Sequence, residues 1–332
     1  MNSPRSQSFV SRRQLLQGAA AIGSGLIFPK LPSRAFAWTA GQSQQPPAPS
    51  TEGLERMRTM LGAIPIQSQA LAENLTLLSG PGGNVVVLHG KDGMLVVDTF
   101  VAPAWPKFKE SLAAVGKEPV KLVIDTHWHY DHSDNNGPLH QAGATVIAHE
   151  NTKTRMTQTH ETALLGIKVP PSPVEALPQQ TFKDTHKLDF GGETLHLGHI
   201  PPAHTDTDIY VHFEKADVLH AGDCFFGGMY PFIDVETGGS IAGMINATDK
   251  LLAMAGSKTK IISGHGPIGG KEEVTKFRDM LSTARDRIQK LKSSGKTVQE
   301  AVAAKPFADL DSTWGKTFFT SDQFVQIVYP AL

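Results

Sequence analysis

The sequence predicts a mixed α/β (α+β) protein built as a four-layer αββα sandwich, with two sheets packed between helices. Three observations predict this class. Hydrophobic residues make up 40% of the 332 positions, which is enough for a sizeable core. The 31 glycines and 22 prolines indicate many turns between short strands. Each half of the body runs through several apolar strands into a helix, so each half can supply one sheet and one covering layer.

The first 37 residues predict an export signal that takes no part in the fold. Residues 11–16 hold a twin-arginine pattern, the apolar run 18–28 is short for a membrane span, and residues 35–37 form an A-x-A cleavage site. The pattern resembles a Tat-type signal peptide. That resemblance implies a bacterial periplasmic or exported location, with the twin-arginine export machinery as a partner. Retention of the signal as an uncleaved anchor stays open as the less favoured alternative.

Charge and cysteine content narrow the possible partners of the body. Residues 38–53, rich in Gln, Pro and Ser, predict a flexible linker, so the folded domain is expected over 54–332. The chain's 31 basic residues less the five in the signal leave 26 against 32 acidic residues, a net of -6. This balance argues against nucleic acid as a partner and leaves the oligomeric state open. A single cysteine, Cys224, excludes an intrachain disulfide and a Cys-rich zinc knuckle.

The first half of the body alternates between strand and helix signals. Val- and Leu-rich runs separated by glycine-containing turns predict antiparallel hairpins. Residues 156–180, with four prolines and no clear period, predict a surface loop or flap. The expected elements are strands at 75–78, 85–88 and 94–98, a helix at 105–115, a strand buried on both faces at 120–125, and a strand at 144–148 followed by a short helix.

The second half repeats this rhythm and then ends in helices. Apolar residues recur at steps of three and four from Val274 to Leu291, which predicts an amphipathic helix. Thr297 and Glu300 form a capping box for another short helix. The remaining expected elements are strands at 194–200, 209–213, 218–221 and 260–263, and a helix at 242–255.

The chemistry gathers directly after the strand at 120–125. His127, His129, Asp131 and His132 lie within six positions of one another. The i, i+2 spacing of the first two histidines suits an extended loop whose alternate side chains point the same way. The other two residues follow where the chain turns into a helix, so they can face a second, nearby centre. Imidazole and carboxylate groups are ligands of zinc, iron and manganese. Four such residues within six positions disfavour the alternative, a polar loop whose histidines only form hydrogen bonds within the protein.

The H-x-H-x-D-H motif resembles the signature of the metallo-β-lactamase-fold hydrolases, over about residues 70–270. Four further residues at strand ends match the family's other elements in the family's order. Asp98 matches the aspartate that supports the ligand loop from behind, and His204 the next histidine ligand. Asp223 matches the bridging aspartate and His265 the last ligand.

The resemblance implies a site for two metal ions, zinc in the first place, with iron or manganese as alternatives. Two cations would lower the pKa of a bridging water, and the resulting hydroxide would attack a carbonyl or phosphorus centre. Asp131 would also orient the nucleophile and move its proton. The implied ligands are His127, His129 and His204 for the first ion, Asp131, His132 and His265 for the second, and Asp223 for both.

Asp223 also bears on the substrate class. The best-known β-lactamase subclass has a cysteine here, whereas a bridging aspartate is more similar to glyoxalase-II-type thioesterases, lactonases and phosphodiesterases. Cys224 should point away from the site, since neighbours in a strand face opposite sides. The lysine that binds the antibiotic carboxylate in that subclass is missing near Phe226. An apolar stretch follows that predicts either a substrate pocket or ordinary loop packing, formed by Phe225, Phe226, Met229, Tyr230 and Phe232.

Several functions stay open on these grounds. The first is a dinuclear zinc hydrolase of a small-molecule carbonyl compound: a β-lactam or a similar cyclic amide, ester or thioester. A lactonase or phosphodiesterase on the same site is the alternative hydrolase. An iron-containing redox enzyme similar to a sulfur dioxygenase forms a separate class. A metal-binding partner protein without catalysis is the third possibility, and the full ligand set disfavours it.

Overall fold

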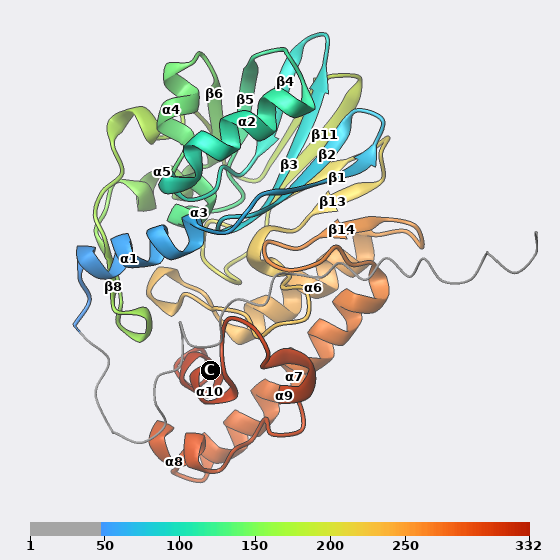
Figure 1. The fold of residues 1–332 in the computed structure, drawn as a ribbon. Coiled ribbons are helices and arrows are strands. Elements are labelled where there is room, and N and C mark those ends of the chain that lie inside the picture. Colours follow the sequence, from blue (N-terminus) through green and yellow to red (C-terminus); the bar gives the residue numbers. More distant parts are fainter. Residues whose placement is uncertain (1–47) are drawn as a thin grey trace, which may run out of the picture. The chain divides into compact units, whose positions relative to one another are not determined.

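The computed structural model describes residues 48–332 (Figure 1). The chain divides into a unit of residues 1–40 and a unit of residues 41–332. The predicted signal peptide and most of the predicted linker therefore lie outside the described residues. Among the residues described, no helix combines the length and apolarity needed to cross a membrane.

Two sheets form the centre of the described unit, as predicted. In spatial order the first sheet contains β1 (Gln67–Ala72), β2 (Leu75–Gly80), β3 (Gly83–Gly90), β4 (Gly93–Val97), β5 (Val120–Ile124), β6 (Thr145–His149) and β9 (Gln180–Phe182). The second contains β10 (Thr185–Phe190), β11 (Glu193–His199), β12 (Ile209–Phe213), β13 (Val218–His220) and β14 (Lys260–Ile262). The first sheet is antiparallel from β1 to β4 and parallel from β4 to β9, and the second is antiparallel except for the parallel pair β13 and β14.

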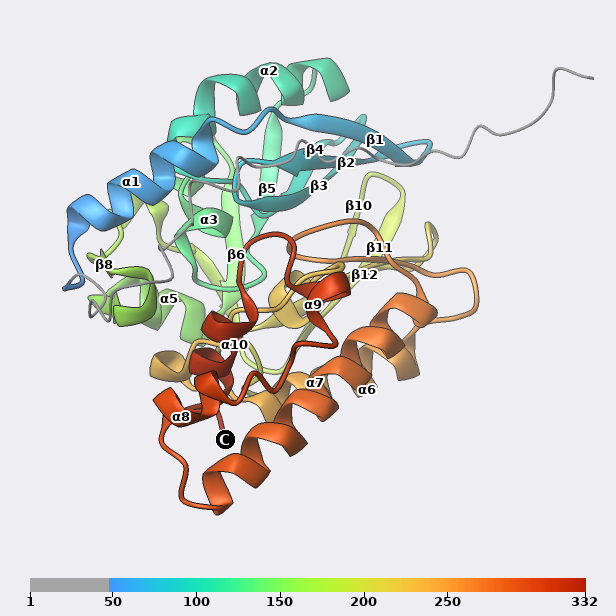
Figure 2. The ribbon, with the colours of Figure 1, turned by 60° about the horizontal axis from the view of Figure 1, so that its bottom comes forward.

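Helices cover the outer faces of the two sheets. Figure 2 shows α2 on one side of the paired sheets and α6 and α7 on the opposite side. The helices are α1 (Thr51–Gly62), α2 (Trp105–Val115), α3 (Tyr130–Ser133), α4 (Asn136–Gln141), α5 (Glu150–Met156), α6 (Ile241–Met254), α7 (Lys271–Ser293), α8 (Val298–Ala303), α9 (Asp311–Trp314) and α10 (Ser321–Val328). The predicted αββα layering is confirmed.

The layers are held together by two large apolar clusters. One lies between the sheets and joins residues such as Val97 and Ile124 of the first sheet to Phe213 and Ile262 of the second. The other packs the outer face of the second sheet against α6, α7 and the C-terminal helices, and it includes Phe277. Burial of apolar area on this scale is the main stabilising contribution to such a fold.

Local sequence signals located several elements accurately. The helix predicted at 105–115 is α2, and the amphipathic pattern starting at Val274 is the buried face of α7. The Thr297 side chain accepts a hydrogen bond from the Glu300 amide, and the Glu300 carboxylate accepts one from the Thr297 amide. This reciprocal capping box opens α8, as predicted.

Three expectations about the first half need correction. Residues 156–180 are not a bare loop, because they contain the small hairpin of β7 (His160–Thr162) and β8 (Ile167–Val169). This hairpin buries Ile167 against α1 and Trp128. Its strands have three residues each, which is too short for a strand pattern to be recognised in the sequence. Helix α1 begins at Thr51, inside the predicted linker, after the Ser50 side chain has capped it. Strand β5 is buried at its C-terminal end only.

A stacked histidine pair joins the ends of the two sheets. The rings of His149, at the end of β6, and His199, at the end of β11, lie 3.9 Å apart and nearly parallel. Burial lowers the pKa of both imidazoles, a charge on His199 further lowers that of His149, and the nearby Lys250 ammonium further lowers that of His199. The His199 Nε2 atom donates to the Asp206 carbonyl at 3.3 Å, and the Lys250 amine donates to the His199 carbonyl at 2.8 Å.

We expect this pair to make folding acid-sensitive. The unfolded histidines take up protons near pH 6.5, while the folded pair holds a lower pKa, so the free energy of unfolding should fall as pH drops through 6.5. Urea unfolding at pH 7.5 and pH 5.5 measures this loss. The variant His199→Gln should show a smaller difference between the two pH values than the parent chain, whereas His89→Gln should not. Equal pH dependence in all three proteins would contradict the expectation.

Candidate metal centre

The H-x-H-x-D-H segment continues directly from the buried end of β5. The chain stays extended through His129, whose φ of -60° and ψ of 146° precede the first residue of α3. His127 and His129 therefore leave the same side of the loop, while the indole of Trp128 turns into a buried apolar cluster. Asp131 and His132 project from the first turn of α3. The predicted change from extended loop to helix is confirmed.

The remaining ligand residues come from loops that follow strands of the second sheet. His204 lies between β11 and β12, in a turn fixed by the Asp208 carboxylate, which accepts hydrogen bonds from the amides of His204 (2.8 Å) and Thr205 (2.9 Å). Asp223 lies in a single 3-10 turn just after β13, and His265 follows β14. All seven side chains thus meet at one edge of the paired sheets.

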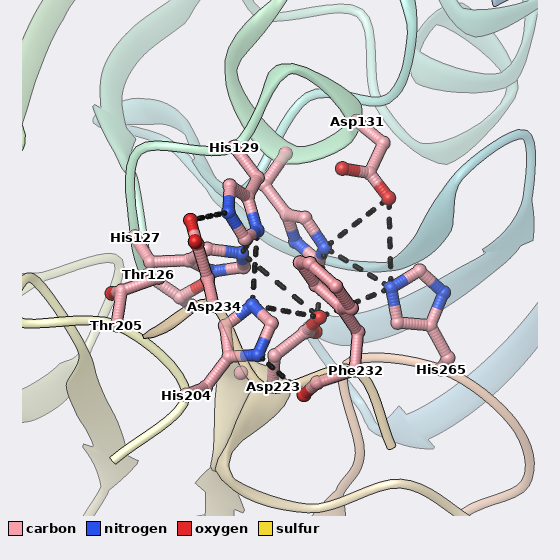
Figure 3. Close-up of polar contacts among 12 residues, drawn as sticks. Thr126, His127, His129, Asp131, His204, Thr205, Asp223, Phe232, Asp234 and His265 are labelled. Carbon is pink, nitrogen blue, oxygen red and sulfur yellow. Dashed lines mark hydrogen bonds and ion pairs between the residues drawn. The ribbon is translucent and has the colours of Figure 1, made fainter. Parts of the chain in front are cut away.

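One group of potential ligands contains three imidazoles. The His129 Nδ1 atom lies 3.1 Å from His127 Nε2 and 2.9 Å from His204 Nε2 (Figure 3). The three rings meet edge to face, with centroids 4.7–4.8 Å apart. These nitrogens could hold one metal ion together.

A second group lies beside it. His132 Nε2 is 3.3 Å from His265 Nε2, and the Asp131 Oδ2 atom lies 3.8 Å and 3.6 Å from these two nitrogens. His265 and Asp131 are the most exposed of the seven side chains, at 25% and 15%, whereas His132 is 1% exposed. The centre therefore opens to solvent on the side of this second group.

The carboxylate of Asp223 stands between the two groups. Its Oδ2 atom lies 3.4 Å from His204 Nε2 and 3.3 Å from His265 Nε2, and its Oδ1 atom lies 3.4 Å from His132 Nε2. Figure 3 shows this carboxylate in the middle of the ligand side chains. No other carboxylate among the described residues contacts histidines of both groups.

The residues fit a pair of divalent cations. Nitrogens at about 2.0–2.1 Å from one tetrahedral ion lie about 3.4 Å apart, close to the separations between the imidazoles here. Asp223 Oδ1 is buried and has no hydrogen-bond partner in the described part of the chain. A buried carboxylate oxygen without a partner is costly, and a cation would satisfy it.

The electrostatics of the centre attract positive charge. Burial raises the pKa of the Asp223 carboxyl, but His265, His132 and the neighbouring histidines hold it well below its usual range. Burial opposes a charge on His132, yet Asp223, Asp131 and Asp98 raise the pKa of its imidazole to about 10. Desolvation lowers the pKa of His204 to about 4, so that ring stays neutral and free to ligate.

Asp98 supports the second group from behind, where the resemblance placed it. Its Oδ2 atom is 2.8 Å from His132 Nδ1, and its two oxygens accept hydrogen bonds from the Thr126 amide and hydroxyl, both at 2.8 Å. The backbone of Asp98 has a φ of 65°, an uncommon value for a residue other than glycine. The carboxylate fixes the ring so that His132 Nε2 faces the centre.

The sequence analysis missed an equivalent support for the first group. Asp234 is buried, and its Oδ2 atom lies 3.0 Å from His129 Nε2 while accepting a 2.7 Å hydrogen bond from the Thr237 hydroxyl. The same loop holds His204, whose Nδ1 donates to the Phe232 carbonyl at 2.9 Å. Asp234 follows His129 by 105 positions with no local pattern around it, so no sequence signal identified it.

The five residues of the predicted apolar pocket lie in different surroundings. Phe226 stacks on His265 with ring centroids 5.3 Å apart, and Phe232 lies 6.1 Å from both His129 and His204. Phe225, Phe226 and Tyr230 are all buried in the core cluster, and the Phe226 ring reaches the centre only through its stack on His265. Met229 is half-buried against the same core cluster.

Cys224 does not belong to the centre. It is fully buried in the core cluster, and burial raises the pKa of its thiol well above the usual range. Cys224 points away from the ligands as expected, but the strand geometry behind that expectation is wrong, because residues 222–224 form a 3-10 turn. His220 is also buried outside the ligand groups and accepts a hydrogen bond from the Gly222 amide, which braces the turn of Asp223.

Residues 78–266 match the family model of the metallo-beta-lactamase superfamily. The chain belongs to this superfamily. It is 26% identical over 198 residues to a probable metallo-hydrolase of Methanocaldococcus jannaschii, covering 58% of this chain and 91% of that protein. It is 27% identical over 170 residues to a hydroxyacylglutathione hydrolase of Pelagibacter ubique, covering 51% of this chain and 58% of the relative.

Solved structures agree with this fold. A metallo-beta-lactamase from Pontibacter korlensis aligns with a TM-score of 0.55 at 16% identity, covering 65% of this chain and 99% of that chain. The inverting sec-alkylsulfatase Pisa1 from a Pseudomonas species aligns with a TM-score of 0.61 at 15% identity, covering 83% and 51%. The protein is a metallo-β-lactamase-superfamily hydrolase, and its fold and His/Asp clusters imply binding of divalent metal.

Proposed function

We propose that this hydrolase uses two zinc ions to cleave a small-molecule carbonyl compound, namely a β-lactam or a similar cyclic amide, ester or thioester. The observation that carries the proposal is the carboxylate of Asp223, which lies against His204 on one side and His132 on the other. Such a donor set suits a pair of cations, which would supply a hydroxide nucleophile near neutral pH and polarise the substrate carbonyl.

The chain's own residues supply orientation and proton transfer. Asp98 and Asp234 fix the rings of His132 and His129 so that one nitrogen of each faces the centre. Asp131 is the one carboxylate of the ligand set on the more open side, so it can orient the attacking water and accept its proton. Delivery of that proton to the leaving group would complete the cleavage of the carbonyl bond.

Thioesters should be tested as substrates together with β-lactams. The relative from Pelagibacter ubique is named a hydroxyacylglutathione hydrolase, and the bridging position here is an aspartate. Lactones and phosphodiesters are the alternative substrates of the same centre. A sulfur dioxygenase-like enzyme is the redox alternative, and it would need iron in place of zinc.

Metal removal tests the proposal directly. The purified chain should contain about two zinc ions by mass spectrometry and hydrolyse nitrocefin, a lactone or a thioester. Dialysis against a chelator should lower that rate by at least about 100-fold, and added Zn²⁺ should restore it. Zinc-loaded protein without turnover on the whole panel would contradict the proposal. Redox-active iron with oxygen uptake would replace it by the dioxygenase alternative.

We also propose export of the chain through the twin-arginine route. The supporting observation is the pattern at residues 11–16 followed by the cleavage motif at 35–37. Fractionation of cells that express the full chain, followed by N-terminal sequencing of the exported product, would test both export and cleavage. Uncleaved protein in the membrane fraction would support the anchor alternative instead.

A further inference from the structure

The ring of Phe232 lies at the centre itself. Its centroid is 6.1 Å from His129 and 6.1 Å from His204, and Figure 3 shows it among the ligand side chains. The backbone of the same residue is fixed, because its carbonyl accepts the 2.9 Å hydrogen bond from His204 Nδ1. Phe232 is half-buried, so part of this apolar surface remains open beside the metal ligands.

A second aromatic residue supports this ring from the C-terminal region. Phe319 is 2% exposed and stacks on Phe232 with centroids 6.1 Å apart and planes 25° apart. Phe318 packs edge-on against Phe319 at 4.6 Å. Both phenylalanines lie beyond residue 266, outside the part of the chain that matches the superfamily model. This aromatic support therefore comes from the C-terminal segment, beyond the matched residues.

The two segments are joined firmly. The Tyr230 amide donates to the Trp314 carbonyl at 3.1 Å, and the Tyr230 hydroxyl donates to Asp311 at 3.0 Å. The Tyr230 ring stacks on Phe324 of α10 with centroids 4.4 Å apart. Because Tyr230 is only two residues from Phe232, the C-terminal segment fixes the position of the Phe232 ring relative to the ligands.

We infer that Phe232, held by Phe319, contacts the apolar part of the substrate and makes the enzyme selective for substrates that carry an alkyl chain or ring beside the reacting carbonyl. This inference rests on the proposed function. Phe226 also stacks on a ligand ring, that of His265, but it is 4% exposed and belongs to the core, so Phe232 is the aromatic ring left to meet a substrate. A carbonyl group placed between the ligand groups would bring its neighbouring carbons against the Phe232 ring.

Binding of straight-chain alkyl hydroxamates to the zinc-loaded full chain tests the inference without turnover. Their head group is constant and binds metal, so only the alkyl length changes from the acetyl to the octanoyl member. A methylene buried on one side should improve the affinity about twofold. Calorimetry should therefore show a Kd that falls by about this factor per methylene in the parent chain.

Variants distinguish direct contact of Phe232 with the alkyl chain from a general effect of core packing. Phe232→Ala should flatten the dependence of Kd on chain length, while Phe232→Leu should retain most of it. Phe319→Leu, which keeps the core filled, should weaken the dependence without changing the Kd of the acetyl member. Phe182→Ala, a control at the end of β9, should leave it unchanged. A flat series in the parent chain, or an unchanged series in Phe232→Ala, would overturn the inference.

The same proteins distinguish this inference from the proposed function. Turnover of the substrate panel without any chain-length dependence would refute the role of Phe232 and leave the hydrolase proposal standing. A clear chain-length dependence without turnover of any carbonyl substrate would support the role of Phe232 and refute the proposed reaction.

Discussion

Replacement of Asp223 by alanine is expected to lower hydrolysis by about 10³-fold or more. Removal of an outer support of a metal ligand commonly costs about 10–100-fold, and Asp223 stands closer to the chemistry than such a support. Its carboxylate is the single one that lies against His204, His265 and His132 together among the described residues. Without it, the five histidine ligands would lose the anion that offsets the charge of two cations.

The metal content should change together with the rate. Mass spectrometry should find about two zinc ions in the parent chain and one or none in Asp223→Ala. Asp249→Ala is a matched control, because this carboxylate is exposed on α6 and, within residues 48–332, pairs only with Arg278. A variant at position 223 that keeps both ions and the parent rate would show that the carboxylate does not join the two ligand groups.

Substitution of Gly264 by alanine is expected to have the second-largest effect. A Cβ atom built at this position would fall on the Asp223 Oδ1 atom and 2.8 Å from the Gly222 carbonyl carbon. The backbone cannot shift easily to make room for a Cβ atom. The Gly264 amide donates to the Gly222 carbonyl at 2.7 Å, and the Gly264 carbonyl accepts from the Asn84 amide at 2.9 Å. We expect the carboxylate to be displaced and activity to fall by at least about 100-fold.

Zinc stoichiometry, the hydrolysis rate and the midpoint of thermal unfolding would measure this effect. Gly256→Ala provides the control, since a Cβ there meets only the Thr259 hydroxyl at 3.4 Å. The control should retain both ions and the parent rate, and Gly264→Ala should lose at least one ion. Full metal content and activity in Gly264→Ala would mean that the Asp223 carboxylate can lie elsewhere and still serve the centre.

Sequence patterns identified those parts of the fold that local interactions define. Helix α2 and the buried face of α7 follow from the spacing of apolar residues, and the capping box of Thr297 and Glu300 uses only neighbouring groups. Short pieces with few local signals were missed. The hairpin of β7 and β8 is such a case, because burial of Ile167 against α1 stabilises it more than its own sequence does.

In the candidate centre too, local patterns predict some features, and contacts between distant segments decide the others. The spacing of His127 and His129 fixes their common direction, since alternate residues of an extended chain face one side. The direction of Phe225 against Phe226 and the support of His129 by Asp234 depend on contacts between segments far apart in the chain. The spacing of residues in the sequence does not predict such contacts, because they arise from how the loops pack.

The amino-acid sequence by itself determined the two-sheet layering and the ligands of the H-x-H-x-D-H segment, because periodicity and neighbouring residues encode these features, and the resemblance to the family added the three ligands that follow strands of the second sheet. Only the tertiary structure decided that Asp223 lies between both ligand groups, that Asp234 orients His129, and that Phe319 backs Phe232. The physical reason is that the free energy of these contacts comes from packing and hydrogen bonding between distant segments, whose relative positions are fixed only when both sheets and the C-terminal helices come together.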